Sequence, residues 1–396
     1  MEFTPIVPTD LSGKINPKHL EKALDIITKS ATLKGSHNHH ILNEIISLLR
    51  VTNSYYSNMI ESEGTHPIDI DRAMKHDFAQ DDKKRSLQKL SLAHIEVQKY
   101  IETHIENTLR IFENKFLLEI HKQFYSQDEM DRFLDVQYKE LKATMTPGRI
   151  RDMDVTIGSH LAPLKDVVES LLNSFEHMYN QSSHLSKAEQ LIYALCSHHR
   201  LVWIHPFLDG NGRVSRLYLD YLFFKIKLDG YGLWNISRGL ARDVDKYKAS
   251  LHYADMVVQG AGDGRGPLSN RGLDSFLDFM LDTALDQVNY MGKYLKIDSL
   301  GTNIEKYVKL SQNGFFDSEP LPKYSEIVFK ELLIKGSIAR GEVSKIIGKS
   351  DRTASTLISK LIKADFLQSK SHKEAISLKF NPHFASYIIP ELMPQK

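Results

Sequence analysis

One run of glycine and polar residues constrains this chain more than any other feature. It reads His205-Pro206-Phe207-Leu208-Asp209-Gly210-Asn211-Gly212-Arg213, with Arg216 three residues further on. Apolar residues recur at helical spacing on both sides, which predicts a helix, a tight loop and a second helix. The proline ends the first helix, and the glycines permit a turn in which backbone N–H groups converge at the start of the second. Such a turn predicts an anion site, and phosphate is the anion that fits it best.

The residue types in this run suit phosphate chemistry. His205 can be neutral near pH 7 and accept a proton from a hydroxyl. Asp209 offers a hard oxygen ligand for Mg²⁺ carried in by a nucleotide, and Arg213 offers a planar fork to phosphate oxygens. Together they indicate metal-assisted phosphoryl or nucleotidyl transfer. The alternative is a plain helix corner, but a corner has no use for this set of polar groups.

The run also resembles the signature of the Fic family, His-Pro-Phe-x-Asp-Gly-Asn-Gly-Arg-x-x-Arg, without a mismatch. Enzymes of that family move AMP from ATP onto a Ser, Thr or Tyr hydroxyl of a protein. The resemblance implies that His205 is the catalytic base and Asp209 the Mg²⁺ ligand. It implies a phosphate-binding role for the remaining residues: Gly210, Asn211 and Gly212 in the anion hole, Arg213 on the distal phosphates and Arg216 on the γ-phosphate.

A second segment, from Ser57 to Glu61, precedes this run by about 150 residues. Its two end residues are spaced i, i+4, so they share one face of a predicted helix. Spacing alone favours a capping or solvent-exposed pair. The segment also resembles the inhibitory helix of many Fic proteins, Ser/Thr-x-x-x-Glu-Gly/Asn, although Ser62 stands where Gly or Asn is usual. That resemblance implies that Glu61 lies at the nucleotide site and forms an ion pair with Arg216.

Two further assignments leave alternatives open. Residues 148–160 follow Pro147, which ends a helical pattern, and show the alternation and β-branched residues of a hairpin. They resemble the family's flap, whose edge can hold a target segment by strand addition, and an ordinary surface hairpin is the alternative. Tyr247 either packs its own helix or contacts the nucleotide, as its resemblance in position to the family's nucleotide-contacting tyrosine implies.

Other stretches are expected to be structural. Residues 1–20 contain several prolines and predict an extended arm, and residues 65–85 predict a surface connection. Three histidines lie close together at 37–40. A solvated loop is favoured there over a metal site, because no carboxylate or cysteine stands at ligand spacing. Residues 260–266 are glycine-rich, but no Lys-Ser/Thr pair follows, so they predict a loop and not a nucleotide-binding P-loop.

The C-terminal stretch, residues 321–396, differs in charge from the rest. It contains 13 Lys and Arg against 7 Asp and Glu, while the whole chain has 51 against 50. Three short helical patterns followed by two strand patterns predict a winged helix-turn-helix domain. Its third helix would direct four polar residues outward: Arg352, Thr353, Thr356 and Lys360. DNA binding and a protein-interaction role both remain open, because the positive charge is modest.

Composition limits the classes of protein to which this chain can belong. A length of 396 residues suggests two or three domains, and near-zero net charge excludes a chain that binds nucleic acid with its whole surface. The single cysteine, Cys196, excludes an internal disulfide and is consistent with a reducing compartment. The N-terminus has no signal-peptide pattern and no apolar stretch approaches 18 residues, so we expect a cytoplasmic protein without membrane contact.

We therefore predict a mainly α-helical protein with the following organisation: an arm and first helix at 1–39, a Fic core at 40–285, a connecting helix or linker at 286–320, and a winged-helix domain at 321–396. The core would contain the inhibitory helix (about 50–62), the flap (about 148–160) and the signature (205–216). The expected activity is protein adenylyltransfer from ATP with Mg²⁺, onto target proteins and the chain itself, restrained by Glu61. The alternatives are a nucleotide-sensing DNA-binding regulator and a transferase of UMP, phosphocholine or phosphate. A homodimer is left open.

Overall fold

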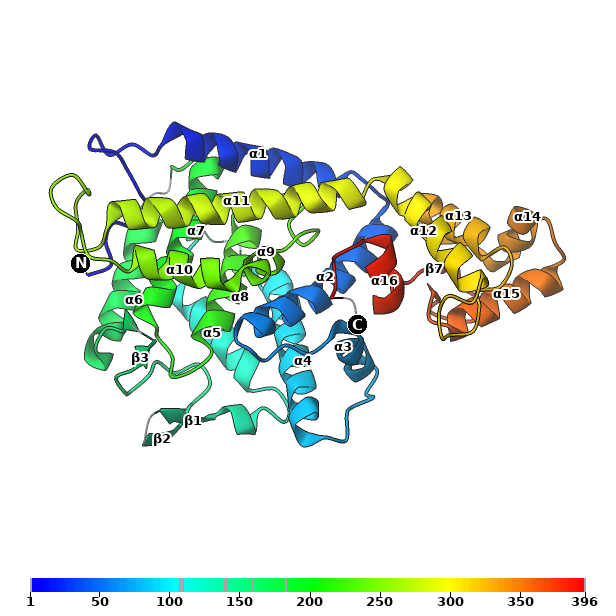
Figure 1. Ribbon diagram of the computed structural model, residues 1–396, viewed down its shortest axis with the longest axis horizontal. Helices are drawn as coiled ribbons and strands as arrows, with labels where there is room; N and C mark the ends of the chain where they lie inside the picture. The colour runs from blue at the N-terminus through cyan, green and yellow to red at the C-terminus, as the bar shows by residue number, and fades with distance from the viewer. Residues whose placement is uncertain are drawn as a thin grey trace.

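The computed structural model describes residues 2–106, 108, 110–138, 141–158, 160–181 and 184–394. The protein is mainly α-helical, as predicted, with a few short strands (Figure 1). The main helices before the signature are α1 (Pro17–Lys34), α2 (His39–Ile60), α3 (Pro67–Met74), α4 (Asp82–Thr103), α5 (Asn114–Tyr125), α6 (Lys165–Asn180) and α7 (Lys187–Ile204). Those after it are α8 (Asn211–Lys225), α9 (Ile236–Arg242), α10 (Val244–Ala254), α11 (Asn270–Tyr294) and α12 (Ile297–Gln312).

Helices α7 and α8 form the centre of the protein, because both are buried on nearly every face. Helices α1 and α11 cover α7, while α2, α4 and α5 pack around α8. The polar residues of α8 that are buried with its apolar ones include three charged residues in its first three turns, Arg213, Arg216 and Asp220. Buried charges need partners, so the neighbours of these three residues define the functional region.

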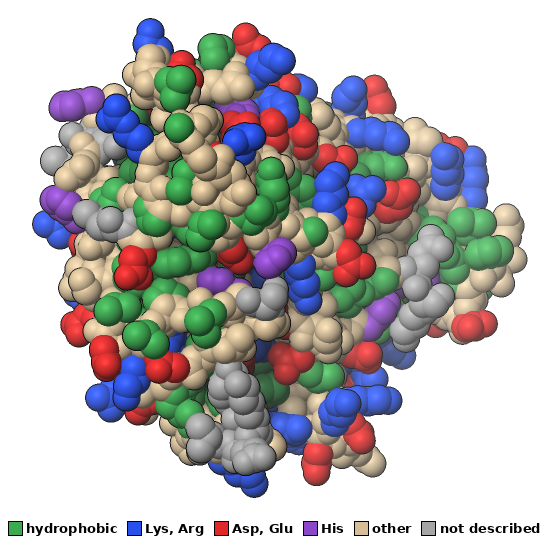
Figure 2. Space-filling model, turned by 60° about the vertical axis from the view of Figure 1, so that its left-hand side comes forward, with side chains coloured by type: hydrophobic (Ala, Val, Ile, Leu, Met, Phe, Trp, Pro, Cys, Tyr) green, Lys and Arg blue, Asp and Glu red, His purple; other side chains and the backbone are tan. Residues whose placement is uncertain are grey.

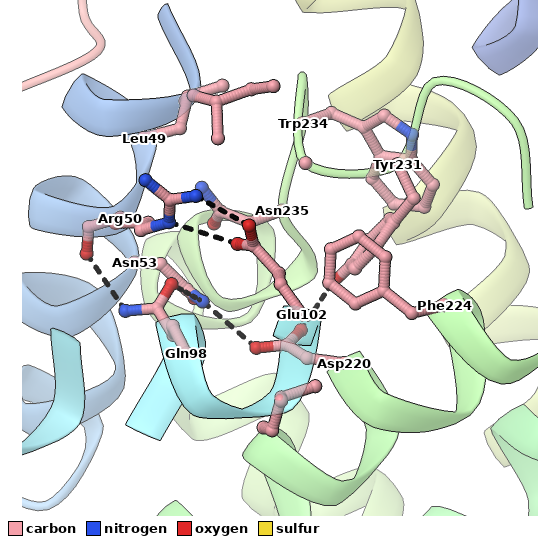
Figure 3. Close-up of a pocket in the computed structure, with 13 residues that line it drawn as sticks. Leu49, Arg50, Asn53, Gln98, Glu102, Asp220, Phe224, Tyr231, Trp234 and Asn235 are labelled. Atoms are coloured by element: carbon pink, nitrogen blue, oxygen red, sulfur yellow. Dashed lines mark hydrogen bonds and ion pairs between the residues drawn. The ribbon is translucent and has the colours of Figure 1, made fainter. Parts of the chain in front are cut away.

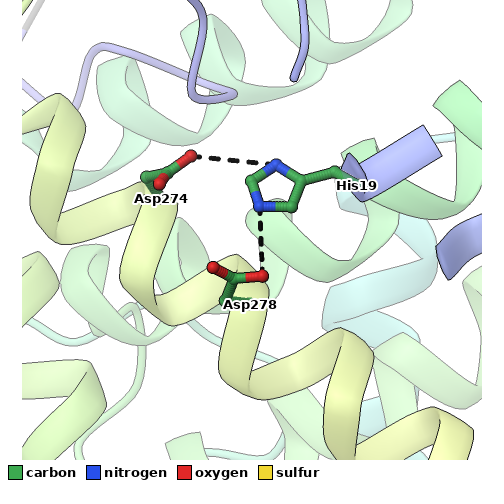
Figure 4. A group of neighbouring side chains, drawn as sticks. All are labelled: His19, Asp274 and Asp278. Carbon is green, nitrogen blue, oxygen red and sulfur yellow. Dashed lines mark ion pairs between the residues drawn. The ribbon is translucent and has the colours of Figure 1, made fainter. Parts of the chain in front are cut away.

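Helix α1 lies along α11, and a buried histidine ties the two together (Figure 1, Figure 4). His19 directs Nε2 at Asp278 (3.3 Å) and Nδ1 at Asp274 (3.7 Å). Lys22 also pairs with Asp278, at 3.0 Å. Because the two carboxylates face different ring nitrogens and a lysine neutralises one of them, we interpret the group as a link between helices and not as a metal site.

The N-terminal arm, residues 2–16, contains no helix or strand and is packed against the core, while residues 17–20 of the predicted arm belong to α1. Phe3 is fully buried. The backbone oxygens of the arm accept hydrogen bonds from core side chains: Pro5 from Arg200 Nε at 3.0 Å, and Ile6 from the Tyr179 hydroxyl at 2.8 Å. The arm is therefore part of the folded core and not a free extension.

Residues 65–85 were expected to be a surface connection, and that prediction is wrong. They contain α3, in which Ile70 and Ala73 are buried. Pro67 stands in the first turn of the helix, where a missing N–H costs nothing, and Asp69 complements the helix dipole there. The residues taken as loop signals are helix-start signals.

Strands occupy two segments before α6. β1 (Asp135–Tyr138) and β2 (Leu141–Thr144) form an antiparallel hairpin where a helical pattern was expected to continue to Pro147. β3 (Thr156–Ile157) and β4 (His160–Leu161) pair within the predicted flap, of which Ser159 lies outside the described residues. The flap hairpin is shorter than predicted, because residues 149–155 run along the signature loop instead of pairing as a strand.

The three histidines near the start of α2 show no shared ligand geometry. His37 Nε2 bonds the Leu295 carbonyl at 2.5 Å, while His39 and His40 form the first turn of α2. Within the described residues, the cluster of potential metal ligands is the His19 group and does not include them. The loop interpretation favoured from the sequence agrees with this arrangement.

The predicted boundary at 285 falls inside α11, which continues unbroken to Tyr294. The stretch predicted as a connecting helix or linker, residues 286–320, contains the end of α11 and helix α12, which buries Leu300 and Ile304. Beyond it the elements are α13 (Ser325–Lys335), β5 (Ser337–Ile338), α14 (Val343–Ile347), α15 (Asp351–Lys363), β6 (Leu367–Gln368), β7 (Ile376–Leu378) and α16 (Pro382–Ile388). The strands form one antiparallel sheet in the order β5-β7-β6. The three helices and two strands expected in this stretch are present, and β5 and α16 were not expected.

The last described residues return from this region to the core, where α16 lies beside α3 (Figure 1). The carbonyl of Leu392 accepts from the Tyr56 hydroxyl of α2 at 3.2 Å, and that of Pro390 accepts from Tyr290 of α11 at 2.7 Å. Acidic and basic side chains are interspersed on the face in Figure 2. Among the described helices, none is long and apolar enough to cross a membrane.

Candidate active site

The signature forms a tight turn between α7 and α8, as predicted. His205 ends α7 in the left-handed conformation (φ 52°), and Gly210 precedes α8 with φ 79°. The Tyr125 ring packs against Gly210 so closely that a Cβ there would lie 2.3 Å from the phenol oxygen. Only glycine fits this position, both for its backbone conformation and for the space left by Tyr125.

Asn211 holds the turn closed from inside. Its Oδ1 accepts from the Phe207 N–H at 2.9 Å, and its Nδ2 donates to the Phe207 carbonyl at 2.8 Å. Both polar atoms of its side chain therefore bond within the loop. A phosphate would be contacted by its backbone N–H instead. The first backbone bond of α8 is donated by Val214 to Gly210 (2.9 Å), so the preceding N–H groups of the helix point out of its N-terminus. This is the backbone geometry that the predicted anion site requires.

His205 lies at the wall of this site. Burial, followed by the nearby positive charges of His160 and Arg151, lowers the pKa of its imidazole to about 3. One ring nitrogen is hydrogen-bonded to the backbone oxygen of Val202, so the other is left as an acceptor. A neutral imidazole with one free acceptor nitrogen is suited to act as a general base.

Arg151 fixes the backbone around His205, and the sequence analysis did not identify this role. Its Nε donates to the His205 carbonyl at 2.8 Å, and its own backbone N–H donates to Pro206 at 2.9 Å. The same guanidinium bonds the carbonyls of Met153 and Pro163 on either side of the flap hairpin. Buried Arg151 therefore joins the flap to the catalytic turn. Its place between Pro147 and the hairpin offered no signal for a buried cation.

Asp209 faces the same cavity with its side chain 45% exposed. Its Oδ2 lies 3.2 Å from Arg213 Nη2 and 3.4 Å from the Tyr125 hydroxyl. Mg²⁺ is typically held by one or two carboxylates together with substrate phosphates. A half-exposed carboxylate beside a helix N-terminus fits that requirement, so Asp209 is a suitable ligand for a nucleotide-borne Mg²⁺.

Arg216 is almost completely buried and is held by α2. Its Nε donates to Ser57 Oγ at 2.9 Å, and its Nη2 donates to the Ser57 carbonyl at 2.8 Å. Its Nη2 also forms an ion pair with Glu61 Oε1 at 2.7 Å. The predicted contact between two stretches about 150 residues apart is thus present in the structure.

The Glu61 carboxylate lies directly over the catalytic turn. A Cβ added to Gly212 would lie 2.1 Å from Glu61 Oε1, so the carboxylate occupies the space above this glycine. Burial acts to raise the pKa of the Glu61 carboxyl, but the charges of Arg216 and Arg213 outweigh it and lower the pKa. Glu61 is therefore ionised at neutral pH and occupies part of the anion site.

Arg213 has a carboxylate partner that the sequence analysis missed. Glu63 Oε2 lies 2.5 Å from Arg213 Nη1, and Asp209 lies on the other terminal nitrogen. Glu63 follows the predicted inhibitory motif by two residues. Helical spacing could not indicate its direction, since the helix has already ended at Ile60.

Two adjoining cavities open at these residues. One, of about 380 Å³, is lined by Glu61, by residues 155–158 and by most of the signature. The other, of about 470 Å³, extends towards Trp203, Lys248 and Leu251. The cavities share residues of the flap, the signature and α2: Glu61, Ile157, Gly158, His205 and Gly212. Their combined size suits a small ligand with an anionic end and a larger, partly apolar end.

Tyr247 lines the second cavity and is buried. Its hydroxyl lies 2.7 Å from His198 Nε2 of α7. Both alternatives from the sequence are therefore compatible with its position, since Tyr247 packs between helices and also faces the cavity. The four residues of α15 singled out in the C-terminal stretch are exposed and line neither cavity: Arg352, Thr353, Thr356 and Lys360.

Comparison with known proteins agrees with this geometry. Residues 112–223 match the model of the Fic/DOC family. The chain is 41% identical over 78 residues to protein adenylyltransferase Fic of Drosophila virilis and 40% identical over the same length to that of Drosophila melanogaster. The matched stretch covers 20% of this chain and only 16% of either relative.

Similar folds occur in solved structures. A Fic domain-containing signaling protein from Bacteroides thetaiotaomicron has a TM-score of 0.53 at 17% identity, with 69% of this chain and 97% of that one covered. A Fic family protein from Desulfovibrio desulfuricans covers 94% of this chain and 98% of its own, with a TM-score of 0.50 at 14% identity. At such identities the likeness concerns the fold. Taken with the family match, it shows that residues 112–223 form a domain of the Fic/DOC family.

Proposed function

We propose that this chain transfers AMP from ATP to a hydroxyl group of a protein side chain, and that its own Glu61 restrains the reaction. One observation carries the proposal. The neutral imidazole of His205, the carboxylate of Asp209 and the N-terminus of α8 all face one cavity. Proton acceptance, metal binding and phosphate binding are therefore available in a single place.

In the proposed reaction, the target hydroxyl gives its proton to the free ring nitrogen of His205. The hydroxyl oxygen forms a bond to the α-phosphorus of ATP. The bond between that phosphorus and the oxygen that bridges to the β-phosphate breaks, and pyrophosphate leaves with the electron pair. Arg151 keeps His205 in position through its backbone, as described above.

The phosphates would be bound by the N–H groups at the start of α8 and by the two arginines of that helix. When bound by Asp209, Mg²⁺ would neutralise part of the charge on the phosphates. Arg213 would hold the distal phosphates with its planar fork, since its terminal nitrogens already face two oxygen partners. Charge stabilisation of this kind supplies most of the rate in phosphoryl and nucleotidyl transfer.

Glu61 would restrain the reaction through its place over Gly212. A carboxylate there repels the γ-phosphate and occupies Arg216, which the resemblance assigns to that phosphate. ATP would then bind with its α-phosphate turned away from the attacking hydroxyl, and misplacement of this kind can cost about 10²-fold in rate. Ser57 supports the restraint, because it holds the same guanidinium through two hydrogen bonds.

The target segment would lie along the β3–β4 hairpin. Leu161 is 75% exposed and Ile157 is 40% exposed, so the hairpin offers apolar side chains as well as a strand edge. Addition of a target strand at this edge would bring its hydroxyl towards His205, since Ile157 and Gly158 line the same cavity.

The experiment that tests this proposal uses the position of the label in ATP. The Glu61→Gly variant would be incubated with Mg²⁺ and ATP labelled either on the α-phosphate or on the γ-phosphate, with and without a cell lysate. Transfer of AMP leaves only the α-label on protein, whereas transfer of phosphate leaves only the γ-label. A pure nucleotide sensor leaves neither label, which would overturn the assignment as a transferase.

We propose as a second candidate role that residues 321–394 form a winged-helix domain that binds DNA. The exposed face of α15 motivates it, because Arg352 and Lys360 both lie there and neither is buried. Removal of both charges should lower the affinity for DNA and its salt dependence. Filter binding with genomic fragments at low salt provides the measurement. If the unaltered protein is not retained, a role in protein interaction remains. Dimerisation stays a prediction.

A further inference from the structure

The carboxylate of Glu63 stands where a nucleotide phosphate would be expected. Arg213 has a side chain only 4% exposed, and its two terminal nitrogens are engaged by Glu63 at 2.5 Å and Asp209 at 3.2 Å. Under the proposed function, Asp209 would bind a metal ion and Arg213 would bind the distal phosphates. Glu63 is then the one partner of Arg213 that has no part in the reaction.

The backbone at the end of α2 brings Glu63 to this position. Ser62 adopts the left-handed conformation (φ 64°), and its N–H bonds the Met59 carbonyl at 2.9 Å. The N–H of Glu63 bonds the Asn58 carbonyl, also at 2.9 Å, which completes the hydrogen-bond pattern of a Schellman cap. The direction of Glu63 is therefore set by a defined turn and not by a flexible side chain alone.

The residue after Glu63 keeps the chain close to the helix end. A Cβ on Gly64 would lie 3.1 Å from the Cβ of Met59, so the chain folds back over the last turn of α2. One cap thus presents two carboxylates to α8. Glu61 contacts Arg216 and Glu63 contacts Arg213, one helical turn apart.

We propose that Glu63 is a second restraining residue, which competes with the β-phosphate of a bound nucleotide for the guanidinium of Arg213. The inference deepens the proposed function and depends on it. It differs from the role of Glu61, which is expected to turn the α-phosphate away from the target. Glu63 acts instead on the affinity for nucleotides that carry more than one phosphate.

Competition at Arg213 has a consequence that a merely structural ion pair does not share. AMP has no β-phosphate, so its affinity does not depend on whether Glu63 occupies Arg213. ADP and ATP must displace the carboxylate. Removing its charge should therefore strengthen the binding of ADP and of ATP, while the binding of AMP stays the same.

The test is calorimetric titration with AMP, ADP and an ATP analogue whose α,β-bridge is a methylene group, all with Mg²⁺. Glu63→Gln keeps the size of the side chain and removes its charge. We expect the ADP and analogue dissociation constants to fall on the order of tenfold, which corresponds to about 1.4 kcal/mol. The dissociation constant for AMP should change by less than about twofold, a difference of about 0.4 kcal/mol.

Glu176→Gln serves as the matched control. Glu176 is also a partly buried glutamate paired with an arginine, Arg110, at 3.1 Å, and it lines neither cavity. It should bind all three nucleotides as the unaltered protein does. Thermal unfolding of each variant confirms that the affinities compare folded proteins.

Three results would overturn the inference. An equal change for AMP and ADP would mean that Glu63 affects the whole pocket. Weaker binding of ADP by Glu63→Gln would mean that Glu63 supports Arg213 or the metal ion, and unchanged binding would mean that the carboxylate gives way freely. In each case the proposed function survives, because nucleotide still binds. If no variant binds any nucleotide, the proposed function fails together with the inference.

Discussion

Arg213 and Arg216 lie a single turn apart on one helix, but their guanidinium groups have different kinds of partner. Arg216 is enclosed between α8 and α2, where it bonds the backbone and side chain of Ser57 as well as Glu61. Arg213 contacts the carboxylates of Glu63 and Asp209, and neither of these residues belongs to α2. A phosphate can therefore replace a partner of Arg213 without separating two helices. At Arg216 it must compete with a carboxylate that is built into a helix end.

Helix α2 makes further contacts with α8 and α4 through residues that precede Ser57. Asn53, one turn before Ser57, donates to Asp220 at 3.0 Å and to Gln98 of α4 at 2.9 Å (Figure 3). Arg50, earlier on α2, pairs with Glu102 of α4 (Figure 3). Helix α2 is thus tied to its neighbours over its second half. Under the proposed function, the comparison implies a rigid restraint at Arg216 and a weaker restraint at Arg213, which a phosphate can displace at a cost in affinity.

The largest effect is expected at a third residue, His205. In the Glu61→Gly background, His205→Ala should lower the rate of AMP transfer by about 10²–10⁴, because a positioned base contributes this much. ATP affinity should stay the same, since the phosphate contacts lie elsewhere. Single-turnover rates and calorimetry on the same preparations measure the two quantities. A loss of affinity equal to the loss of rate would mean that His205 binds nucleotide instead of acting as a base.

The second prediction compares the two arginines directly through stability. Arg216→Met should lower the free energy of unfolding by about 3 kcal/mol, because it removes two hydrogen bonds to Ser57 as well as the ion pair with Glu61. Arg213→Met should cost about 1 kcal/mol, because its partners can turn to solvent. Urea unfolding of both variants provides the measurement. Equal losses would remove the distinction between a rigid and an exchangeable restraint.

The third prediction concerns the hydroxyl of Ser57. Ser57→Ala removes one hydrogen bond to Arg216 and leaves the bond to the Ser57 carbonyl. A bond to a charged group contributes about 1.5 kcal/mol, so the restrained state should weaken and AMP transfer should rise by roughly tenfold. Rates of self-modification at equal ATP test this, with Ser54→Ala, whose hydroxyl bonds Ser91 of α4, as a control on the same helix. A rise of the same size in both variants would indicate general loosening of α2.

The fourth prediction concerns the Asp220 end of the interface and depends on pH. Burial raises the pKa of the Asp220 carboxyl from 3.8 to about 6, although Tyr231 and Asn53 donate hydrogen bonds to it. The folded state therefore holds this proton more tightly than the unfolded state does. The corresponding stability is fully present below pH 3.8 and is lost as the pH rises through 6.

Asp220→Asn should remove that dependence. A shift of about two units corresponds to at most about 3 kcal/mol, so the stability difference between the variant and the unaltered protein should change by up to this amount between pH 4 and pH 7. Urea unfolding at several pH values measures the difference. Parallel pH profiles for the two proteins would show that Asp220 does not carry the effect.

The difference between local and long-range contacts explains which features the sequence could predict. Residues 205–216 form a local unit, so their turn, their helix starts and their glycines follow from neighbouring residues. The contact of Glu61 with Arg216 was reached through family resemblance, because spacing alone favoured an exposed pair. The Glu63 contact depends on the left-handed turn at Ser62, and no periodic pattern reveals which way a side chain leaves such a turn.

Other differences have similar physical causes. The sequence left a helix and a linker open for residues 286–320, because polar residues there alternate with the few apolar ones that α12 buries. Arg151 was taken for part of a strand, but four backbone oxygens around the catalytic turn and the flap satisfy its N–H groups. The return of the C-terminus to Tyr56 is a contact over 336 residues, which local patterns cannot show.

The most direct test of the central claim is the rate of AMP incorporation by Glu61→Gly against that of the unaltered protein, at equal ATP and Mg²⁺, followed by intact-mass spectrometry. If Glu61 restrains an adenylyltransferase, the variant should gain the mass of AMP about 10²-fold faster, in line with the cost of a misplaced phosphate. The double variant Glu61→Gly, His205→Ala should show almost no incorporation. An unchanged or lower rate in Glu61→Gly would contradict the account, because an exposed glutamate without a restraining role predicts that result.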